Sequence, residues 1–186
     1  MGIFSYKDED ALGQVASVDT ATVIVEVNDI EQLKRLQVNR LAVLQSSKPG
    51  QHLIGLITQV TRKRQQPTAD TEEESEELNL CKISLIGSLL DRDGLRINVF
   101  RRTLESLPEI DANCFALEGE FLTAFMRVVS QAVGDASSFA IGKYTLDENA
   151  IAFLNGNKLF QRHAFIGGST GSGKSWTTAK IIEKGA

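Results

Sequence analysis

Alternation of apolar and polar positions is the dominant pattern of residues 11–100 and predicts a series of short β-strands. Runs rich in Val and Ile recur roughly every ten residues, and turn-forming segments such as Asp19-Thr20-Ala21 and Lys48-Pro49-Gly50 separate them. A short helical pattern at residues 30–36 interrupts the series. The predicted strands comprise residues 13–18, 22–27, 41–44, 53–61, 80–87 and 95–100.

The regular spacing of these strands predicts a small β-barrel, closed or partly open, over residues 1–110. Closure removes the exposed edges that short strands would otherwise present to solvent. Gly55 lies inside one strand and indicates a bulge or a tight bend of the kind that barrels need. The expected inward set is Ile24, Leu56 and Val60, and the expected outward set, free to contact another subunit, is Val23, Val25 and Ile57.

Beyond Pro108 the apolar spacing changes from period two to a mixed pattern. Residues 111–150 form a predicted connector that holds a helix at 117–131 and a strand at 139–142. Residues 151–186 begin a second domain, with a strand at 151–154. The apolar side of the predicted helix comprises Phe121, Leu122, Phe125, Met126 and Val129, which we expect to face a core.

Residues 168–175 match the pattern G-x-x-x-x-G-K-[ST] of a phosphate-binding loop at every fixed position. The motif lies between a predicted buried strand at 163–166 and a predicted helix at 174–184, whose apolar side carries Ile181 and Ile182. A strand, a glycine-rich turn and a helix form the setting in which such a loop binds phosphate. The alternative is a glycine-rich turn that only links strand to helix, but such a turn has no need for Lys-Ser at this spacing.

The chemistry of nucleotide binding gives these residue types distinct roles. Glycines let the backbone approach a phosphate in conformations that a Cβ would hinder, so that successive amides can form an anion nest. Lys174 would neutralise the β- and γ-phosphate oxygens, and the Ser175 hydroxyl would ligate Mg²⁺. Trp176 would donate its backbone amide to the α-phosphate, while its indole packs. The predicted nucleotide-binding residues are Gly168, Ser169, Thr170, Gly171, Ser172, Gly173, Lys174, Ser175 and Trp176, with ATP and Mg²⁺ as cofactors.

Hydrolysis by this class of loop requires groups from further strands. An acidic residue on a second strand holds Mg²⁺ and orients water, and an arginine is usually supplied across an interface. We expect both beyond Ala186, so no catalytic set is complete here and the 186 residues alone are not expected to hydrolyse ATP. The predicted fold is a small N-terminal β-barrel followed by the beginning of an α/β RecA-like P-loop NTPase domain, truncated in this sequence.

Composition and charge favour an ordinary cytoplasmic protein. The chain is 42% hydrophobic and 24% charged, with no signal-peptide pattern and no apolar run long enough for a membrane span. Six of the 24 acidic residues fall within residues 63–77, which we interpret as a disordered acidic loop; an electrostatic guard or a partner contact is the alternative. Cys81 is expected to be a buried free thiol. The scarcity of aromatic residues and of basic clusters in residues 1–110 argues against nucleic-acid binding by the barrel itself.

A β-barrel followed by a phosphate-binding loop resembles HerA, the hexameric ATPase and DNA-translocase family related to FtsK. The resemblance is concentrated in Ile141-Gly142-Lys143, in residues 157–163 and in residues 166–175. Trp176 departs from the pattern, because many relatives carry a small polar residue there. The resemblance implies six-membered rings that thread duplex DNA, with ATP sites between subunits and a barrel that stacks on the motor ring and docks a partner, often a nuclease.

Two functions are compatible with this resemblance. The chain would be the ATP-binding subunit of a ring-forming, homo-hexameric DNA translocase or helicase that acts on duplex DNA through the full ring and not through the barrel. Alternatively, it would be an assembly platform that holds an effector enzyme, a nuclease or a sirtuin-type NAD-degrading enzyme, in a bacterial antiviral defence complex, with ATP structural or regulatory.

Overall fold

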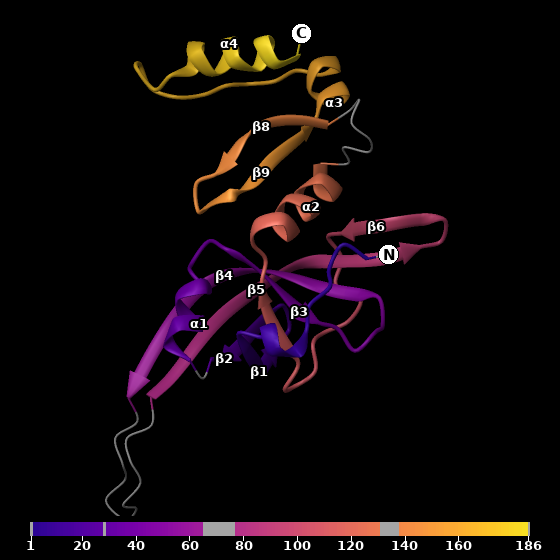
Figure 1. Ribbon diagram of the computed structural model, residues 1–186, viewed down its shortest axis with the longest axis vertical. Helices are drawn as coiled ribbons and strands as arrows, with labels where there is room; N and C mark the ends of the chain where they lie inside the picture. Colours follow the sequence, from indigo (N-terminus) through magenta and orange to yellow (C-terminus); the bar gives the residue numbers. More distant parts are fainter. Residues whose placement is uncertain (1, 28, 65–76, 131–137, 186) are drawn as a thin grey trace, which may run out of the picture. The chain divides into compact units, whose positions relative to one another are not determined.

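The computed structural model describes residues 2–27, 29–64, 77–130 and 138–185, and these form two compact units, Met1–Leu117 and Glu118–Ala186 (Figure 1). The first unit is almost entirely β-structure, with a 3-10 turn at Asp8–Asp10 and one short helix, α1 (Ile30–Arg35). The Asp29 carboxylate begins α1 by accepting a hydrogen bond from the Glu31 amide at 2.9 Å. The strands of the first unit are β1 (Gly13–Asp19), β2 (Thr22–Glu26), β3 (Leu41–Gln45), β4 (Gln51–Arg64), β5 (Glu77–Asp93), β6 (Arg96–Arg101) and β7 (Asn113–Ala116).

Six of these strands close into a barrel, which confirms the predicted N-terminal fold. The sheet runs in the order β2-β1-β7-β3-β4-β5, and β5 returns to pair with β2. Every pairing is antiparallel. β6 lies outside the ring and, among the described strands, pairs only with the end of β5, so that the two form a hairpin extending from the barrel (Figure 1).

Strand β7 closes the ring, although the hydrophobic pattern did not indicate it. The strand has only four residues, and its apolar residues run on directly toward the next helix. It pairs with β1 through Gly13 opposite Cys114, and with β3 through Val43 opposite Phe115. The compact barrel unit therefore extends past the expected limit of residue 110 to Leu117.

The predicted facing of β2 and β4 is wrong at most of its positions. Val23, Val25 and Ile57 were expected outside, yet all three are fully buried in the core. Val23 and Val25 lie opposite Ile83 and Cys81 of β5, which are also fully buried. Ile24 and Leu56 are only partly buried and are not part of the core cluster.

A bulge in β4 explains why alternation along this strand did not give the correct facing. The β4–β5 register shifts between Ile54 and Gly55 and again between Ile57 and Gln59. The second shift reverses the alternation, so that Val60 packs against the core, as expected, on the same side as Ile57. The first shift lies at Gly55, where an irregularity was predicted, but the extra residue is Ile86 of β5. A Cβ at Gly55 would lie 2.2 Å from Ile83 Cγ2.

A second apolar layer covers part of the outside of the barrel. Val43, Ile54 and Phe115 lie opposite one another in register and are almost completely buried. The segment before β1 contributes to this layer, because Phe4 is buried and Tyr6 stacks on Phe115 with ring centroids 4.5 Å apart. The outer face of this part of the barrel is therefore covered by the chain itself.

The acidic segment lies largely outside the described residues, so the predicted disordered loop stays a prediction. On either side of it, β4 continues to Arg64 and β5 begins at Glu77. Arg62 Nη2 lies 2.9 Å from Glu77 Oε2 at this end of the two strands. Cys81 is a buried free thiol, as expected, and Cys114 is another. Burial raises the pKa of Cys81 to about 12 and also raises the pKa of Cys114.

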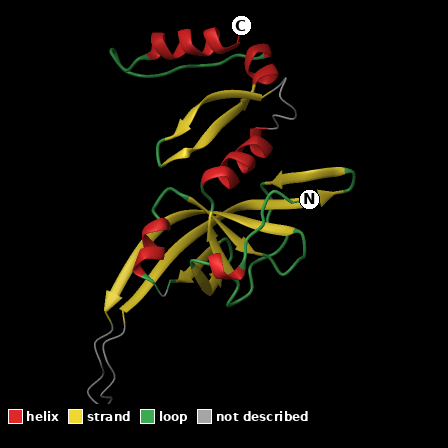
Figure 2. Ribbon diagram, in the orientation of Figure 1, coloured by secondary structure: helices red, strands yellow, loops and turns green. Residues whose placement is uncertain are grey.

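The second unit combines a two-stranded sheet with helices (Figure 2). The predicted helix at 117–131 is confirmed as α2, which buries Leu122 and Phe125. The two predicted strands form the antiparallel hairpin β8–β9. The elements are α2 (Gly119–Ser130), β8 (Ser138–Tyr144), β9 (Asp147–Asn155), α3 (Gly156–Gln161) and α4 (Lys174–Gly185). No helix in the described parts of the chain is both long and apolar enough to cross a bilayer.

Candidate nucleotide-binding site

The glycine-rich loop joins an extended segment to the start of α4. Gly171 and Gly173 have φ angles of 83° and 84°, a left-handed conformation that glycine adopts without strain. Gly168 is required for a different reason, because a Cβ there would lie 2.5 Å from Ser172 Oγ. The Ser172 amide donates to the Ser169 carbonyl at 3.2 Å, which tightens the turn. Gly171 and Gly173 therefore supply positive φ, and Gly168 supplies space for Ser172.

Lys174 lies back across the loop that precedes it. Its Nζ donates to the carbonyl oxygen of Gly168 at 2.9 Å and to that of Ser169 at 2.5 Å. The ammonium is therefore held by neutral carbonyl dipoles at one end of the loop. Carbonyl oxygens are weaker partners for a cation than phosphate oxygens are, because charge-assisted pairs are the stronger hydrogen bonds. The lysine is placed to exchange these partners for an anion.

Helix α4 begins at the lysine and continues for 12 residues. The Thr177 amide donates to the Gly173 carbonyl at 2.9 Å, which begins the helical hydrogen bonding next to the loop. The N-terminal end of this helix adds positive potential where the loop turns. Ser175, the second helical residue, is exposed, as are Ser169 and Thr170 in the loop. A hydroxyl at this position is accessible to a metal ion that accompanies a phosphate.

Trp176 is also exposed, at 68% of its surface. The Lys180 ammonium lies 5.7 Å from the centre of its ring, one helical turn further along α4. The sequence analysis did not identify this pair, although spacing of four residues on a helix was an available signal. The indole was expected to pack. Instead it is exposed and lies beside a cation on the same helix.

The predicted buried strand at 163–166 is not formed. Residues 163–169 have no strand pairing, Phe165 is 95% exposed, and Ile166 is 36% exposed. A strand requires a neighbour, and the β-structure described in this unit is the separate hairpin β8–β9. The expected apolar side of α4 is exposed in the same way, with Ile182 at 61%.

Contacts with α3 and β8 hold α4 in place instead. A Cβ at Gly185 would lie 2.2 Å from Phe160 of α3, so the end of α4 packs directly on that ring. Phe160 meets Phe139 of β8 edge to face, with ring centroids 5.6 Å apart. Lys184 Nζ donates to the Ala140 carbonyl at 3.3 Å. Phe160 is the residue beneath the helix that the sequence analysis missed.

Metal binding is the remaining part of the predicted chemistry. Among residues 2–27, 29–64, 77–130 and 138–185, no three His, Cys, Asp or Glu side chains gather in a way that could hold a metal ion. Mg²⁺ at Ser175 would therefore depend on oxygen atoms of the nucleotide and on water, ligands that Mg²⁺ commonly keeps. The residues present suit a phosphate group, and the loop offers it backbone amides, the Lys174 ammonium and the Ser175 hydroxyl.

Comparison with known protein families gives a match within the second unit. Residues 139–186 match the family model described as the central domain of helicase HerA. The matched segment begins in β8 and contains α3, the glycine-rich loop and α4. No curated protein matches the chain.

Proposed function

The match to the HerA central domain supports a HerA-type family assignment of this chain, and from that premise we propose that the chain is the ATP-binding part of a HerA-type DNA translocase. The arrangement of Lys174 carries the proposal. Its ammonium is held by two carbonyl oxygens within hydrogen-bond distance and can transfer to the β- and γ-phosphates. A HerA-type assignment suggests ATPase activity in general. That this activity drives movement along DNA is our more specific proposal.

The residues of the loop divide the work of binding. Gly168, Gly171 and Gly173 allow the backbone amides of the turn to face the phosphates. Lys174 neutralises the terminal phosphates, and Ser175 ligates the Mg²⁺ ion that bridges them. Hydrolysis would also require an acidic residue and an arginine from other elements.

The ring and its partners are proposals at a larger scale. Six copies would enclose duplex DNA, with the barrels stacked on the motor ring and docking an effector enzyme. Support comes from the closed barrel, a compact unit of its own that precedes in the chain the unit containing the loop. The alternative, an assembly platform for a nuclease or NAD-degrading effector, uses the same loop but assigns ATP a structural or regulatory role.

Nucleotide binding is tested by titrating the protein with Mg-ATP. Trp176 is the only tryptophan of the chain and adjoins the loop, so its fluorescence reports on binding directly. We expect Lys174→Ala to weaken binding about 10- to 100-fold, because a charge-assisted contact contributes roughly 1.5–3 kcal/mol.

The matched control is Lys180→Ala, which removes an ammonium from the same helix but not from the loop. It should change the starting fluorescence, because the cation near the indole is lost, and leave the affinity within about twofold, a difference below 1 kcal/mol. Calorimetry of both variants separates affinity from fluorescence yield. Unchanged affinity in Lys174→Ala would remove the nucleotide site and the proposed function with it.

The two functions are distinguished by ATP turnover of the complete ring with and without duplex DNA. A translocase should be stimulated by DNA and should stop working when Lys174 is replaced. A platform should show no stimulation and should retain its effector in the Lys174→Ala ring.

A further inference from the structure

The hairpin formed by β5 and β6 presents apolar residues where the fold does not use them. Gly94, with a φ of 62°, turns the chain between paired residues Asp93 and Arg96. Leu95, beside it, is fully exposed, and Ile97 is 60% exposed. The outer edge of β6 has no strand beside it in the described residues. Unpaired edges and exposed apolar side chains mark a surface that contacts another molecule.

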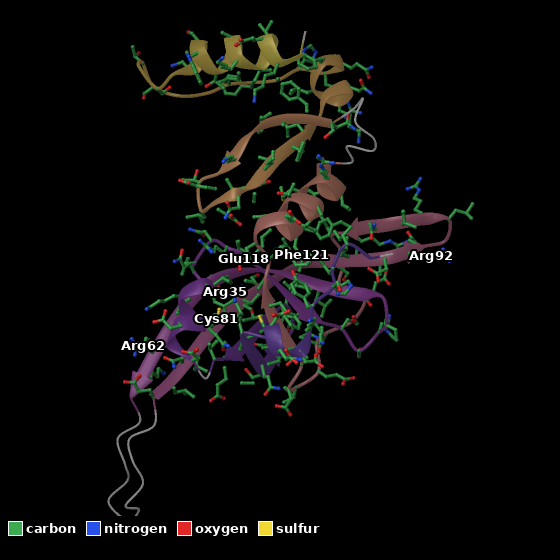
Figure 3. All side chains as sticks on the ribbon, in the orientation of Figure 1. Arg35, Arg62, Cys81, Arg92, Glu118 and Phe121 are labelled. Atoms are coloured by element: carbon green, nitrogen blue, oxygen red, sulfur yellow. The ribbon has the colours of Figure 1, made fainter. Side chains whose placement is uncertain are left out.

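The same hairpin carries positive charge that its own residues do not neutralise. Arg92, Arg96 and Arg102 are exposed, and no ion pair recorded within residues 2–27, 29–64, 77–130 and 138–185 includes them. Arg101 differs, because its guanidinium lies 2.6 Å from Asp93 and 2.8 Å from Glu105. Figure 3 shows Arg92 on this extended hairpin, which we call the basic hairpin, residues 92–102.

A hollow of complementary character lies elsewhere on the barrel unit. It measures about 250 Å³, and its apolar lining residue Ile110 is 57% exposed. Glu109 and Asp111, on either side of Ile110, are exposed, and no ion pair within the described part of the chain involves them. We call it the acidic hollow; it is lined by Gln45, Ser46, Ser47, Glu109, Ile110, Asp111 and Ala112.

Further negative charge adjoins the acidic hollow. Asp8 of the acidic turn Asp8–Asp10 accepts from Gln45 Nε2 at 3.4 Å and from Asn113 Nδ2 at 3.0 Å. The turn is exposed, so its carboxylates extend the negative surface around Gln45. The hollow and its rim therefore suit a group that combines a cation with an apolar contact.

From this complementarity we infer that the basic hairpin of one copy docks in the acidic hollow of a second copy. Leu95 packs on Ile110, and Arg96 inserts its guanidinium between Glu109 and Asp111. Opposite charges across an interface steer docking and fix its register. Pairing of two β6 edges is the main alternative, but it would bring the arginines of two hairpins together, and like charges repel.

A contact between two different surfaces is head-to-tail, and such contacts close into a ring when the rotation per copy allows it. The inference rests on the ring in the proposed function and names the surfaces that build it. It also differs from the expectation that Val23, Val25 and Ile57 mediate assembly, because these side chains are buried inside the barrel.

Cysteine crosslinking of the full chain tests the contact. Leu95→Cys and Ile110→Cys are made in separate chains, mixed at micromolar concentration and treated with a short thiol-to-thiol crosslinker. A head-to-tail contact should link the mixture but neither variant alone, and the double variant should give a ladder of linked copies. The native thiols provide a low background, because Cys81 and Cys114 are fully buried. Links in Leu95→Cys alone would establish hairpin-to-hairpin pairing and overturn the inference.

Charge reversal tests the chemistry of the same contact by light scattering. Arg96→Glu and Glu109→Lys should each weaken association at least tenfold, and the two together should recover most of it. Lys82→Glu, an exposed residue on the barrel portion of β5, is the matched control and should leave association unchanged.

The outcomes separate this inference from the proposed function. A ring that ignores both charge reversals and gives no crosslink overturns the inference and leaves the ring in place. A chain that stays monomeric overturns both the contact and the ring, whereas Mg-ATP titration of Lys174→Ala decides nucleotide binding independently.

Discussion

At the residue scale, His52 shows how the barrel sets the chemistry of one side chain. His52 Nε2 lies 3.4 Å from Asp91 Oδ1, and the Phe4 ring meets the imidazole edge-on with centroids 5.3 Å apart. Burial lowers the pKa of His52 below its usual 6.5, and the Asp91 carboxylate opposes this shift without reversing it. The folded barrel therefore favours the neutral imidazole.

A pH dependence of stability follows from this lowered pKa. Because folded His52 binds its proton less readily than the unfolded chain does, unfolding takes up a proton as the pH falls through 6.5. The free energy of unfolding should rise with pH through the window below 6.5 and then level off. His52→Gln should flatten this part of the profile, measured by urea unfolding from about pH 5 to 8. His163→Gln, at an exposed position, should not; an equal slope in His52→Gln would contradict the assignment.

Gly55 provides a steric prediction at the same scale. A Cβ at this position would lie 2.2 Å from Ile83 Cγ2, inside the core of the barrel. Gly55→Ala should lower the free energy of unfolding by about 1–3 kcal/mol, the usual cost of overpacking. Gly142→Ala is the control, because a Cβ there meets nothing within 4 Å. Chemical denaturation followed by circular dichroism compares each variant with the unchanged chain. Unchanged stability in Gly55→Ala would show that Gly55 is not tightly packed against Ile83.

At the scale of elements, Asp147 ties the β8–β9 hairpin to the start of α2. Its Oδ2 accepts from the Gly119 amide at 2.6 Å, and its Oδ1 accepts from the Asn149 amide at 3.0 Å. Thr123 Oγ1 adds a second tie by accepting from the Ile151 amide at 2.9 Å. The hairpin thus supplies the cap that a helix start requires.

Removing this cap should loosen the two elements together. Asp147→Ala should lower the stability of the second unit by about 0.5–2 kcal/mol, as expected for loss of a helix cap. Hydrogen exchange at Gly119 and Asn149 should accelerate, while exchange in the barrel stays unchanged. Glu148→Ala removes the neighbouring exposed carboxylate and serves as the control. Slow exchange at Gly119 in Asp147→Ala would mean that the amide is protected by another group.

The elements also show how far hydrophobic pattern determines structure. The strands of the barrel were predictable, because alternation and turn residues are local signals. The facing of their side chains was not, because β2 presents apolar residues on both faces and a bulge between Ile57 and Gln59 reverses the alternation in β4. β7 escaped prediction because four residues give too short a pattern, and its role as a closing strand depends on distant partners.

For the candidate site, too, some features could be predicted from the sequence and others could not. The motif identifies the loop from Gly168 to Ser175 in the sequence, because phosphate chemistry fixes residue types at fixed spacing, and phosphate binding by these residues stays a prediction. The strand before it was predicted wrongly, since a strand forms only beside another strand and Phe165 has none. The hydrogen bonds from Lys174 Nζ to the loop carbonyls arise in the folded turn, and the motif alone does not predict them.

At the scale of the whole molecule, the two compact units predict where the chain can be divided. Residues 1–117 contain all six strands of the closed barrel, whereas residues 1–110 lack β7, which joins β1 to β3. The longer fragment should unfold cooperatively, and the shorter one should be largely unfolded or aggregated, because two edges of the sheet are then exposed. Thermal unfolding followed by circular dichroism compares them, and a cooperative transition in residues 1–110 would show that β7 is dispensable.

Strand β5 gives the barrel a mechanical property. Residues 80–84 close the ring against β2, residues 88–93 carry β6, and β4 accompanies the strand along nearly its whole length. A force applied at Leu95 along the strand axis therefore acts on many β4–β5 hydrogen bonds simultaneously, in shear, and does not break them one after another. A force applied at the tip of the basic hairpin is therefore transmitted along one continuous strand to the β2–β5 pairing that closes the barrel.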